Sequence, residues 1–167
     1  GEPGHDSWPG NTWQRGGVPV WVTGSYDAEA KLAYWGTGNA GPWIGDERKG
    51  DNLYATSVIA LDIASGAIRA HHQYHWHDVW DWDEVAAPLL LDLERDGKPT
   101  KALVHAGRDG YLWWLERKPG SIGFVDAKPY VQQNVYTAID PQTGRPSYDE
   151  ARIPRVGQRT EFCPSIW

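Results

Sequence analysis

The sequence of 167 residues predicts an all-β fold, because short apolar or β-branched runs recur along it and no long run has helical periodicity. Turn signals such as Ser65-Gly66, Asp96-Gly97 and Asp109-Gly110 separate these runs. Short strands at roughly ten-residue spacing are typical of a sandwich, a barrel or a propeller. The runs expected to form strands are 18–23, 32–35, 53–61, 87–91, 102–105, 111–115 and 135–139.

Composition narrows the class of protein. The chain holds 11 Trp and 8 Tyr but only 2 Phe, with 19 Gly and 12 Pro, as expected for many short strands joined by turns. A net charge of −6 argues against a nucleic-acid partner, which needs a basic surface. No apolar stretch is long enough to span a membrane, and the first residues do not resemble a signal peptide. We expect residues 1–167 to be part of one domain, cut at both ends.

A weak internal repeat favours the propeller among these folds. The segment from Ala60 to Gly66 resembles the segment from Trp114 to Gly120, since each combines a strand, an acidic residue and a turn that ends in Gly. The copies are 54 residues apart, a period that fits four-stranded propeller blades, so the chain is expected to hold about three blades. A further copy, from Ala138 to Gly144, follows after only 24 residues and breaks the period.

Two glycine-rich turns carry candidate ligand-binding side chains. Asn39 lies at the apex of Trp35-Gly36-Thr37-Gly38-Asn39-Ala40-Gly41, where its carbonyl oxygen could bind a hard cation or where Asn simply tolerates a left-handed turn. Arg108 precedes an Asp-Gly turn, and it is either a surface charge or a guanidinium that binds a ligand oxyanion or a carboxylate. Cys163 has no partner cysteine in the chain, so it is either a plain thiol or paired outside this sequence.

A dense run of histidine and aspartate lies between these turns. In an extended strand, residues two apart share a face, so Asp81 and Asp83 would point together and could hold a hard cation through oxygen, with Trp80 and Trp82 on the opposite face. By the same spacing His75 and His77 would point together, so a second interpretation is a transition-metal site with imidazole ligands, and a third is a solvated strand edge. The histidines of this run are His71, His72, His75 and His77.

These clusters, in this order, resemble the quinoprotein alcohol dehydrogenases over nearly the whole chain. The matching motifs are Trp21-Val22-Thr23-Gly24-Ser25-Tyr26-Asp27, Tyr34-Trp35-Gly36-Thr37-Gly38-Asn39, Gly50-Asp51-Asn52-Leu53-Tyr54, His77-Asp78-Val79-Trp80-Asp81-Trp82-Asp83, His105-Ala106-Gly107-Arg108-Asp109-Gly110 and Cys163-Pro164-Ser165. The resemblance implies an eight-bladed β-propeller of several hundred residues, of which this chain is an interior part. It also implies a periplasmic location and oxidation of an alcohol by pyrroloquinoline quinone with a bound metal ion.

The resemblance also assigns roles to residues. Trp21 matches the tryptophan that stacks under the quinone ring, and Asn39 matches a metal-binding amide. Asp81 matches the catalytic base and a metal ligand, and Arg108 matches the arginine that hydrogen-bonds the quinone oxygens. The metal-binding glutamate of the family has no counterpart here, and the acidic residue often found before the arginine is Gly107.

Asp83 points to the lanthanide-dependent branch, because calcium-dependent members commonly have a small residue at its position. Beside Asp81 and the metal-binding glutamate of the family, which should lie upstream of Gly1, Asp83 would be a third carboxylate, and three negative charges suit a trivalent cation. The cofactors implied are therefore pyrroloquinoline quinone and Ca²⁺ or, in preference, a lanthanide. The partners implied are a small alcohol and a cytochrome c-type electron acceptor or a haem domain, and this chain alone is expected to be inactive. The alternatives are a non-catalytic propeller scaffold and a transition-metal protein built on the four histidines.

Overall fold

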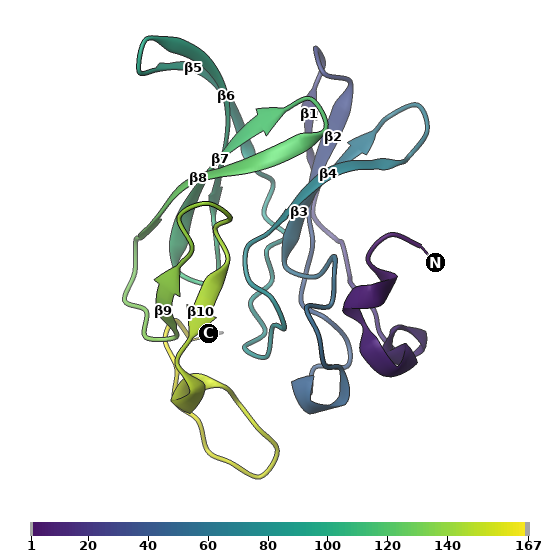
Figure 1. Cartoon of the computed structure of the whole chain (residues 1–167), viewed down its shortest axis with the longest axis vertical. Helices are drawn as coiled ribbons and strands as arrows, with labels where there is room; N and C mark the ends of the chain where they lie inside the picture. The colour runs from purple at the N-terminus through teal and green to yellow at the C-terminus, as the bar shows by residue number, and fades with distance from the viewer. Residues whose placement is uncertain (1, 166–167) are drawn as a thin grey trace.

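Two four-stranded antiparallel sheets contain eight of the ten strands in the structure, a computed structural model that describes residues 2–165 (Figure 1). The first sheet has the order β1-β2-β3-β4, with strands β1 (Ser25–Asp27), β2 (Leu32–Gly36), β3 (Ser57–Asp62) and β4 (Ile68–Gln73). The second has the order β5-β6-β7-β8, with strands β5 (Leu89–Arg95), β6 (Lys98–Ala106), β7 (Tyr111–Lys118) and β8 (Ser121–Pro129).

A two-stranded antiparallel ribbon, β9 (Tyr136–Ile139) with β10 (Pro146–Tyr148), follows the second sheet. The only helices among residues 2–165 are four short 3-10 helices: η1 (His5–Ser7), η2 (Pro9–Gln14), η3 (Gly45–Glu47) and η4 (Glu150–Arg152). None of them is long and apolar enough to cross a membrane. The predicted all-β fold with four-stranded antiparallel sheets is therefore confirmed, with two complete sheets and a shorter third. The two chain ends, where the sequence suggests cuts, include residues 1 and 166–167, which lie outside the described residues.

The internal repeat marks equivalent strands of the two sheets. Its first two copies contain β3 and β7, each of which is the third strand of its sheet, and the turn that follows leads into the fourth strand. In the first copy the carboxylate of Asp62 accepts hydrogen bonds from the backbone N–H groups of Ala64 and Ser65. Asp140 makes the same turn in the third copy, which joins β9 to β10. The break in the period therefore reflects a short ribbon in which the same turn is reused.

Six of the seven expected runs overlap a strand, but the run at 18–23 does not, because it bends at Val22 and does not pair as a strand. Strands β4 and β8 were not expected. Strand β4, Ile68-Arg69-Ala70-His71-His72-Gln73, is rich in polar residues, and β8 mixes apolar residues with Gly, Pro and charged residues. Pairing with β3 and β7 selects both strands rather than an apolar pattern of their own.

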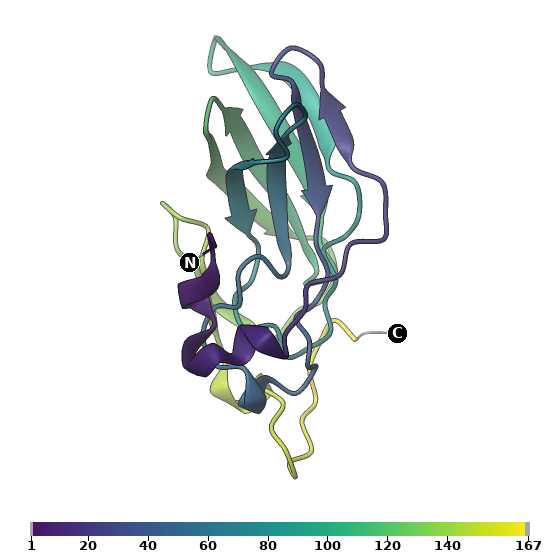
Figure 2. The same cartoon turned by 90° about the vertical axis from the view of Figure 1, so that its right-hand side faces the viewer.

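The core lies where the two sheets face each other, β4 against β8 (Figure 2). His72 of β4 stacks on Phe124 of β8 with 6.3 Å between ring centroids, and its ring also contacts Trp113 of β7. The core continues below the strands into the loops, where Trp80 and Trp82 are completely buried and stack with 5.0 Å between centroids. Tryptophan therefore fills both the space between the sheets and the loop region at one end of them.

Strand alternation decides which loops share an end of the molecule. Because neighbouring strands are antiparallel, the approach to β1, the β2–β3 connection, the β4–β5 connection and the β6–β7 turn all lie at one end of the two sheets (Figure 2). The hairpins that join β1 to β2, β3 to β4, β5 to β6 and β7 to β8 lie at the other end. Trp21, Asn39, Asp81, Asp83 and Arg108 all belong to the first group of loops.

Candidate active site

Asn39 contacts both acidic residues that the sequence singled out. Its side-chain amide donates a hydrogen bond of 2.7 Å to Asp81 Oδ1, and its backbone N–H donates one of 2.9 Å to Asp83 Oδ1. The two carboxylates reach Asn39 from the β4–β5 connection, while Asn39 itself lies in the β2–β3 connection. Three side chains with oxygen atoms that can bind a hard cation are thus brought together from two loops.

The segment that carries Asp81 and Asp83 is not the extended strand that the sequence predicted. Strand β4 ends at Gln73, and Asp81 has a left-handed backbone with φ of 64°. The buried carboxylate of Asp78 holds the loop in this shape, since it accepts the backbone N–H groups of Trp80, Asp81 and Trp82 at 3.2–3.3 Å. The two carboxylates nevertheless face the same residue, because the loop turns around Asp78 rather than continuing a strand.

The electrostatics at Asn39 favour a cation. Burial raises the pKa of Asp81, and the neighbouring Asp83 and Asp78 raise it further. Burial also raises the pKa of Asp83, although the hydrogen bond from Asn39 and the charge of Arg108 oppose this. The carboxylates of Asp81 and Asp83 lie close together in a partly buried place, where their negative charges repel each other. A bound cation would therefore stabilise both in their ionised form.

Trp21 and Gly38 form the other wall of this site. A Cβ atom at Gly38 would lie 2.7 Å from Trp21 Cζ3 and 2.9 Å from Asp83 Oδ1, so only glycine lets the indole and the carboxylate approach here. The Trp21 side chain is 58% exposed, which leaves much of the ring open at the end of the sheets. An open indole beside a pair of carboxylates is a surface on which a planar ligand can stack.

Arg108 is not simply a surface charge, although its side chain is 43% exposed. Its guanidinium donates to Asp83 Oδ2 at 3.3 Å, and its backbone N–H donates to Glu84 Oε2 at 3.2 Å. The β6–β7 turn therefore joins the same site as the two connections that carry Asn39 and Asp83. The structure brings together all five residues that the sequence singled out.

The four histidines, in contrast, do not converge. His71 packs edge-on against Tyr54, His72 lies between the sheets, and the ring of His77 is hydrogen-bonded to the carbonyl oxygen of Gly50. His75 is completely buried at another place, with its Nε2 bonded to Asp78. The expectation that His75 and His77 share a face is wrong, because His77 has a left-handed backbone with φ of 52° and the run is a loop. Among residues 2–165, no metal-ligand group contains two of these histidines.

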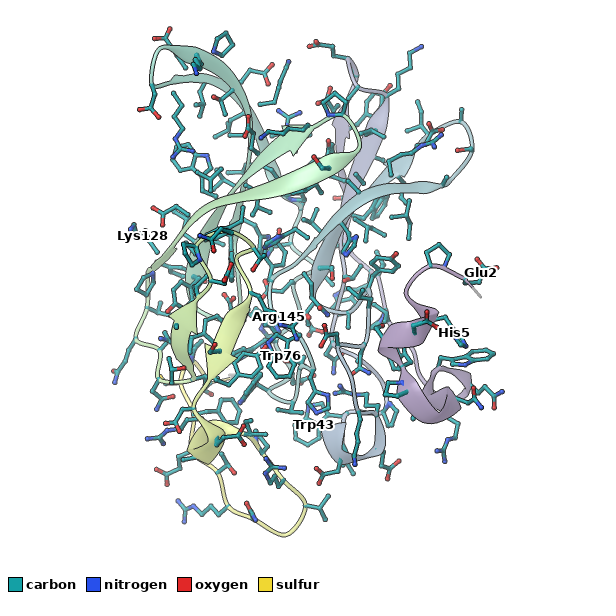
Figure 3. The ribbon with its side chains drawn as sticks, viewed as in Figure 1. Glu2, His5, Trp43, Trp76, Lys128 and Arg145 are labelled. Carbon is teal, nitrogen blue, oxygen red and sulfur yellow. The ribbon has the colours of Figure 1, made fainter. Side chains whose placement is uncertain are left out.

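Several buried residues below the site were not anticipated. Arg48 is completely buried and donates to three backbone carbonyl oxygens, those of Pro42, Trp43 and Asp78, and to the side chain of Asn52. Nearby, Trp76 lies under the guanidinium of Arg145, 4.6 Å from ring centroid to guanidinium carbon (Figure 3). The sequence carries no signal for Arg48, because a charged residue in a loop is normally solvated.

A second unanticipated group is a set of acidic and imidazole side chains that are all buried. Its members are His75, Asp78, Glu84, His105 and Asp109. Glu84 connects the two loops of the site, because its carboxylate contacts His105 Nε2 at 2.5 Å and accepts the backbone N–H groups of Arg108 and Asp109. The sulfur of Cys163, in contrast, makes no disulfide within the described residues.

Comparison with known proteins identifies relatives for this arrangement. Residues 1–135 match the family model described as PQQ: Glucose/ethanol/alcohol dehydrogenase, beta-propeller domain. The chain is 38% identical to quinoprotein alcohol dehydrogenase PedH of Pseudomonas putida over 92% of this chain and 25% of the relative. It is 35% identical to the lanthanide-dependent methanol dehydrogenase of Methylacidiphilum fumariolicum over 97% of this chain and 26% of the relative. The chain thus spans about a quarter of the length of these relatives.

Solved structures give the same picture. The chain superposes on a europium-containing methanol dehydrogenase with a TM-score of 0.90 at 35% identity, covering 99% of this chain and 29% of that one. It superposes on the quinohemoprotein alcohol dehydrogenase of Comamonas testosteroni with a TM-score of 0.81 at 34% identity, covering 89% of this chain and 22% of that one. At these identities the likeness extends to the loops as well as to the sheets.

Proposed function

The chain belongs to the β-propeller domain family of the PQQ-dependent glucose, ethanol and alcohol dehydrogenases, and from this premise we propose that it carries the metal- and quinone-binding face of an alcohol dehydrogenase. The observation that carries the proposal is the convergence of Asn39, Asp81 and Asp83 beside Trp21 and Arg108. A propeller segment that served only as a scaffold would have no reason to keep these side chains together at one end of its sheets.

The residues of the site suit both the metal ion and the quinone that the proposal requires. Asp81 and Asp83 offer carboxylate oxygens to a metal ion, and the amide of Asn39 can present its oxygen to the ion in place of its NH₂ group, since the two ends of the amide occupy the same volume. Gly38 leaves a cradle between Trp21 and Asp83 that any Cβ would fill. The open face of Trp21 suits stacking by a quinone ring.

Each residue then has a specific task. When bound, the quinone supplies the two-electron acceptor for alcohol oxidation and the metal ion supplies Lewis acidity. Asp81 takes the proton of the alcohol hydroxyl as a general base. Arg108 hydrogen-bonds oxygen atoms of the quinone and stabilises negative charge there, while Trp21 fixes the plane of the ring. The backbone N–H of Asn39 holds Asp83 in position.

For the metal we propose a lanthanide in preference to Ca²⁺. Asp83 adds a second carboxylate two residues after Asp81, and its Oδ1 lies within hydrogen-bond distance of the backbone of Asn39. Extra negative charge raises affinity more for a trivalent than for a divalent cation, because the attraction scales with the product of the charges. Two of the relatives are named for a lanthanide requirement or for bound europium.

The electron acceptor and the compartment belong to the same proposal. One relative is named methanol dehydrogenase [cytochrome c] subunit 1, and another, ADH-IIG of Pseudomonas putida, is named a quinohemoprotein. We infer that electrons pass from the bound quinone to a cytochrome c or a haem domain in the periplasm, and that the substrate is a small alcohol.

The proposal is tested with the full natural protein, reconstituted with pyrroloquinoline quinone and either La³⁺ or Ca²⁺. Alcohol oxidation is measured with an artificial electron acceptor. Asp81→Asn should reduce activity by at least about a hundredfold, the usual worth of a general base. Asp126→Asn changes an exposed carboxylate of β8 and should leave activity unchanged. If the protein neither binds the quinone nor oxidises any alcohol with either metal, the scaffold alternative is correct.

A further inference from the structure

Directly below the candidate active site lies a group of buried side chains whose donor atoms face one another. One nitrogen of His75 and one carboxylate oxygen each from Glu84 and Asp109 lie within 4.8 Å of one another, and all three side chains are completely or almost completely buried. His75 and Glu84 flank the loop that carries Asp81 and Asp83, and Asp109 follows Arg108. The group is therefore part of the connection between the two loops of the active site.

Of the two ring nitrogens of His75, one has a hydrogen-bond partner among the described residues and the other has none. Its Nε2 lies 3.2 Å from Asp78 Oδ1. Because the Asp78 carboxylate also accepts three backbone N–H groups, it acts as the acceptor here and Nε2 carries the donated proton. Nδ1 is buried without a hydrogen-bond partner, and its nearest carboxylate oxygen, Glu84 Oε1, is 3.7 Å away. This distance is too long for a hydrogen bond and leaves Nδ1 aimed at the two carboxylates.

In many metal sites a carboxylate accepts the N–H of a histidine ring and so orients the other ring nitrogen toward the ion. Asp78 holds His75 in this way, and the other nitrogen of His75 faces two carboxylates. The two acidic residues are arranged to fit. Glu84 Oε1 accepts a long hydrogen bond, of 3.3 Å, from the backbone of Asp109. Asp109 is fixed by the backbone of Tyr111, the indole of Trp113 and the hydroxyl of Tyr136.

The backbone also makes room for the two carboxylates. A Cβ at Gly107 would lie 2.4 Å from Asp109 Oδ1 and 3.0 Å from Glu84 Oε2, so glycine is required there for them to approach. The group thus concentrates negative charge in a place that water does not reach, which a bound cation would stabilise.

We propose that His75, Glu84 and Asp109 form a buried site for a divalent transition-metal ion, with Zn²⁺ as the best match, separate from the site at Asn39, Asp81 and Asp83. One imidazole and two carboxylates are zinc ligands, whereas Ca²⁺ and lanthanides require many more oxygens. Binding would draw the three donor atoms to about 2.0–2.2 Å from the ion. The second oxygen of a carboxylate or a buried water completes the coordination.

The expected role of this ion is structural. It would tie the β4–β5 connection, through His75 and Glu84, to the β6–β7 turn, through Asp109, and so fix Asp83 relative to Arg108. The site does not depend on the proposed alcohol oxidation, since its ion, its ligands and its measurement differ from those of the active site.

The test is a metal count on the full natural protein, grown with Zn²⁺, La³⁺ and Ca²⁺ and then dialysed against EDTA. We expect the wild-type protein to keep about one Zn²⁺ per chain, and His75→Gln and Glu84→Gln to lose it. His77→Gln, a matched change of a histidine outside the group, should keep the Zn²⁺. The double variant D81A/D83A should also keep Zn²⁺ while it loses the hard cation, which distinguishes this site from the active site.

A second measurement needs no variant. Zinc K-edge absorption of the wild-type protein should show a shell of nitrogen and oxygen only, at about 2.0–2.1 Å, with one imidazole. A wild-type protein that retains no transition metal, or a crystal structure with a water or nothing against His75 Nδ1 and no anomalous zinc peak, would overturn the proposal. Retention of Zn²⁺ by His75→Gln would overturn it as well.

Discussion

The side-chain amide of Asn39 lies 2.7 Å from the carboxylate of Asp81, although 42 residues separate them in the sequence. The contact joins the β2–β3 connection to the β4–β5 connection across the end of the first sheet. It leaves the Asp81 carboxylate paired with a neutral group rather than with a cation, next to a second carboxylate, Asp83. The metal preference proposed for the active site follows from these two neighbouring carboxylates.

Removing Asp83 should change which metal supports activity. Asp83→Ala deletes one carboxylate from the site and keeps Asp81 as the base, so La³⁺-supported alcohol oxidation should fall by at least about tenfold while Ca²⁺-supported oxidation persists or rises. Asp81→Ala should abolish activity with both metals, because the base is lost. The measurement is quinone-dependent alcohol oxidation by each variant of the full natural protein after reconstitution with each metal. Equal loss with both metals in Asp83→Ala would mean that Asp83 is structural.

Gly38 should be essential for quinone binding. In Gly38→Ala the new Cβ would meet Trp21 at 2.7 Å and Asp83 at 2.9 Å, so the indole must shift out of its position. Overpacking of this kind costs about 1–3 kcal/mol, which corresponds to roughly tenfold or more in quinone affinity. Gly17→Ala is the control, because no atom lies within 4 Å of a Cβ there. Titration of quinone absorbance or Trp fluorescence measures the affinity, and equal affinities for the two variants would show that the cradle is not used.

Arg48 should be worth more to stability than any exposed arginine. Arg48→Met leaves the carbonyl oxygens of Pro42, Trp43 and Asp78 without their donor in a dry environment. Each unpaired buried group costs about 1–3 kcal/mol, so the free energy of unfolding should fall by about 3 kcal/mol or more. Arg69→Met removes an exposed ion pair with Asp62 and should cost at most about 1 kcal/mol. Urea unfolding of both variants gives the comparison, and a similar loss in each would contradict it.

His72 should make the fold sensitive to acid. Burial between the sheets lowers its pKa to about 3, so the folded protein keeps His72 neutral while the unfolded chain binds a proton below its ordinary value near 6.5. Stability contributed by this group is therefore present above about pH 6.5 and is lost as the pH falls toward 3. Its replacement in His72→Gln should flatten the fall in melting temperature over that range. His5→Gln, a change of a partly exposed histidine outside the core, is the control. A His72→Gln slope equal to wild type would refute the assignment.

Much of the fold could be predicted from local pattern. The two copies of the repeat, at 60–66 and 114–120, mark the third strands of two sheets, because an apolar run followed by an acidic residue and a turn glycine is a local signal. Strands β4 and β8 could not be found this way. β4 is largely polar and β8 has a mixed pattern, and it is hydrogen bonding to β3 and β7 that selects them. The prediction at 18–23 was wrong for the same reason, since an apolar run without a partner does not form a strand.

The residue types at the candidate site were also evident from the sequence, but their arrangement was not. Asp81 and Asp83 were expected to face together along a strand, and they do meet at Asn39, though by a loop that folds around the buried carboxylate of Asp78. The histidines show the opposite case. Residues two apart share a face only in an extended chain, and the left-handed backbone at His77 separates it from His75.

Strand propensity is a property of residues and their near neighbours, so the sequence was sufficient for an all-β fold. It named Trp21, Asn39, Asp81, Asp83 and Arg108 because their motifs, in this order, resemble a known family. Burial is a property of the packed molecule. Only the tertiary structure could show that Arg48 and Glu84 are removed from water, because a charged residue in a loop is solvated unless distant parts of the chain cover it. The same packing leaves His75 with a nitrogen facing Glu84 and Asp109, a juxtaposition that depends on two loops brought together by the alternation of antiparallel strands.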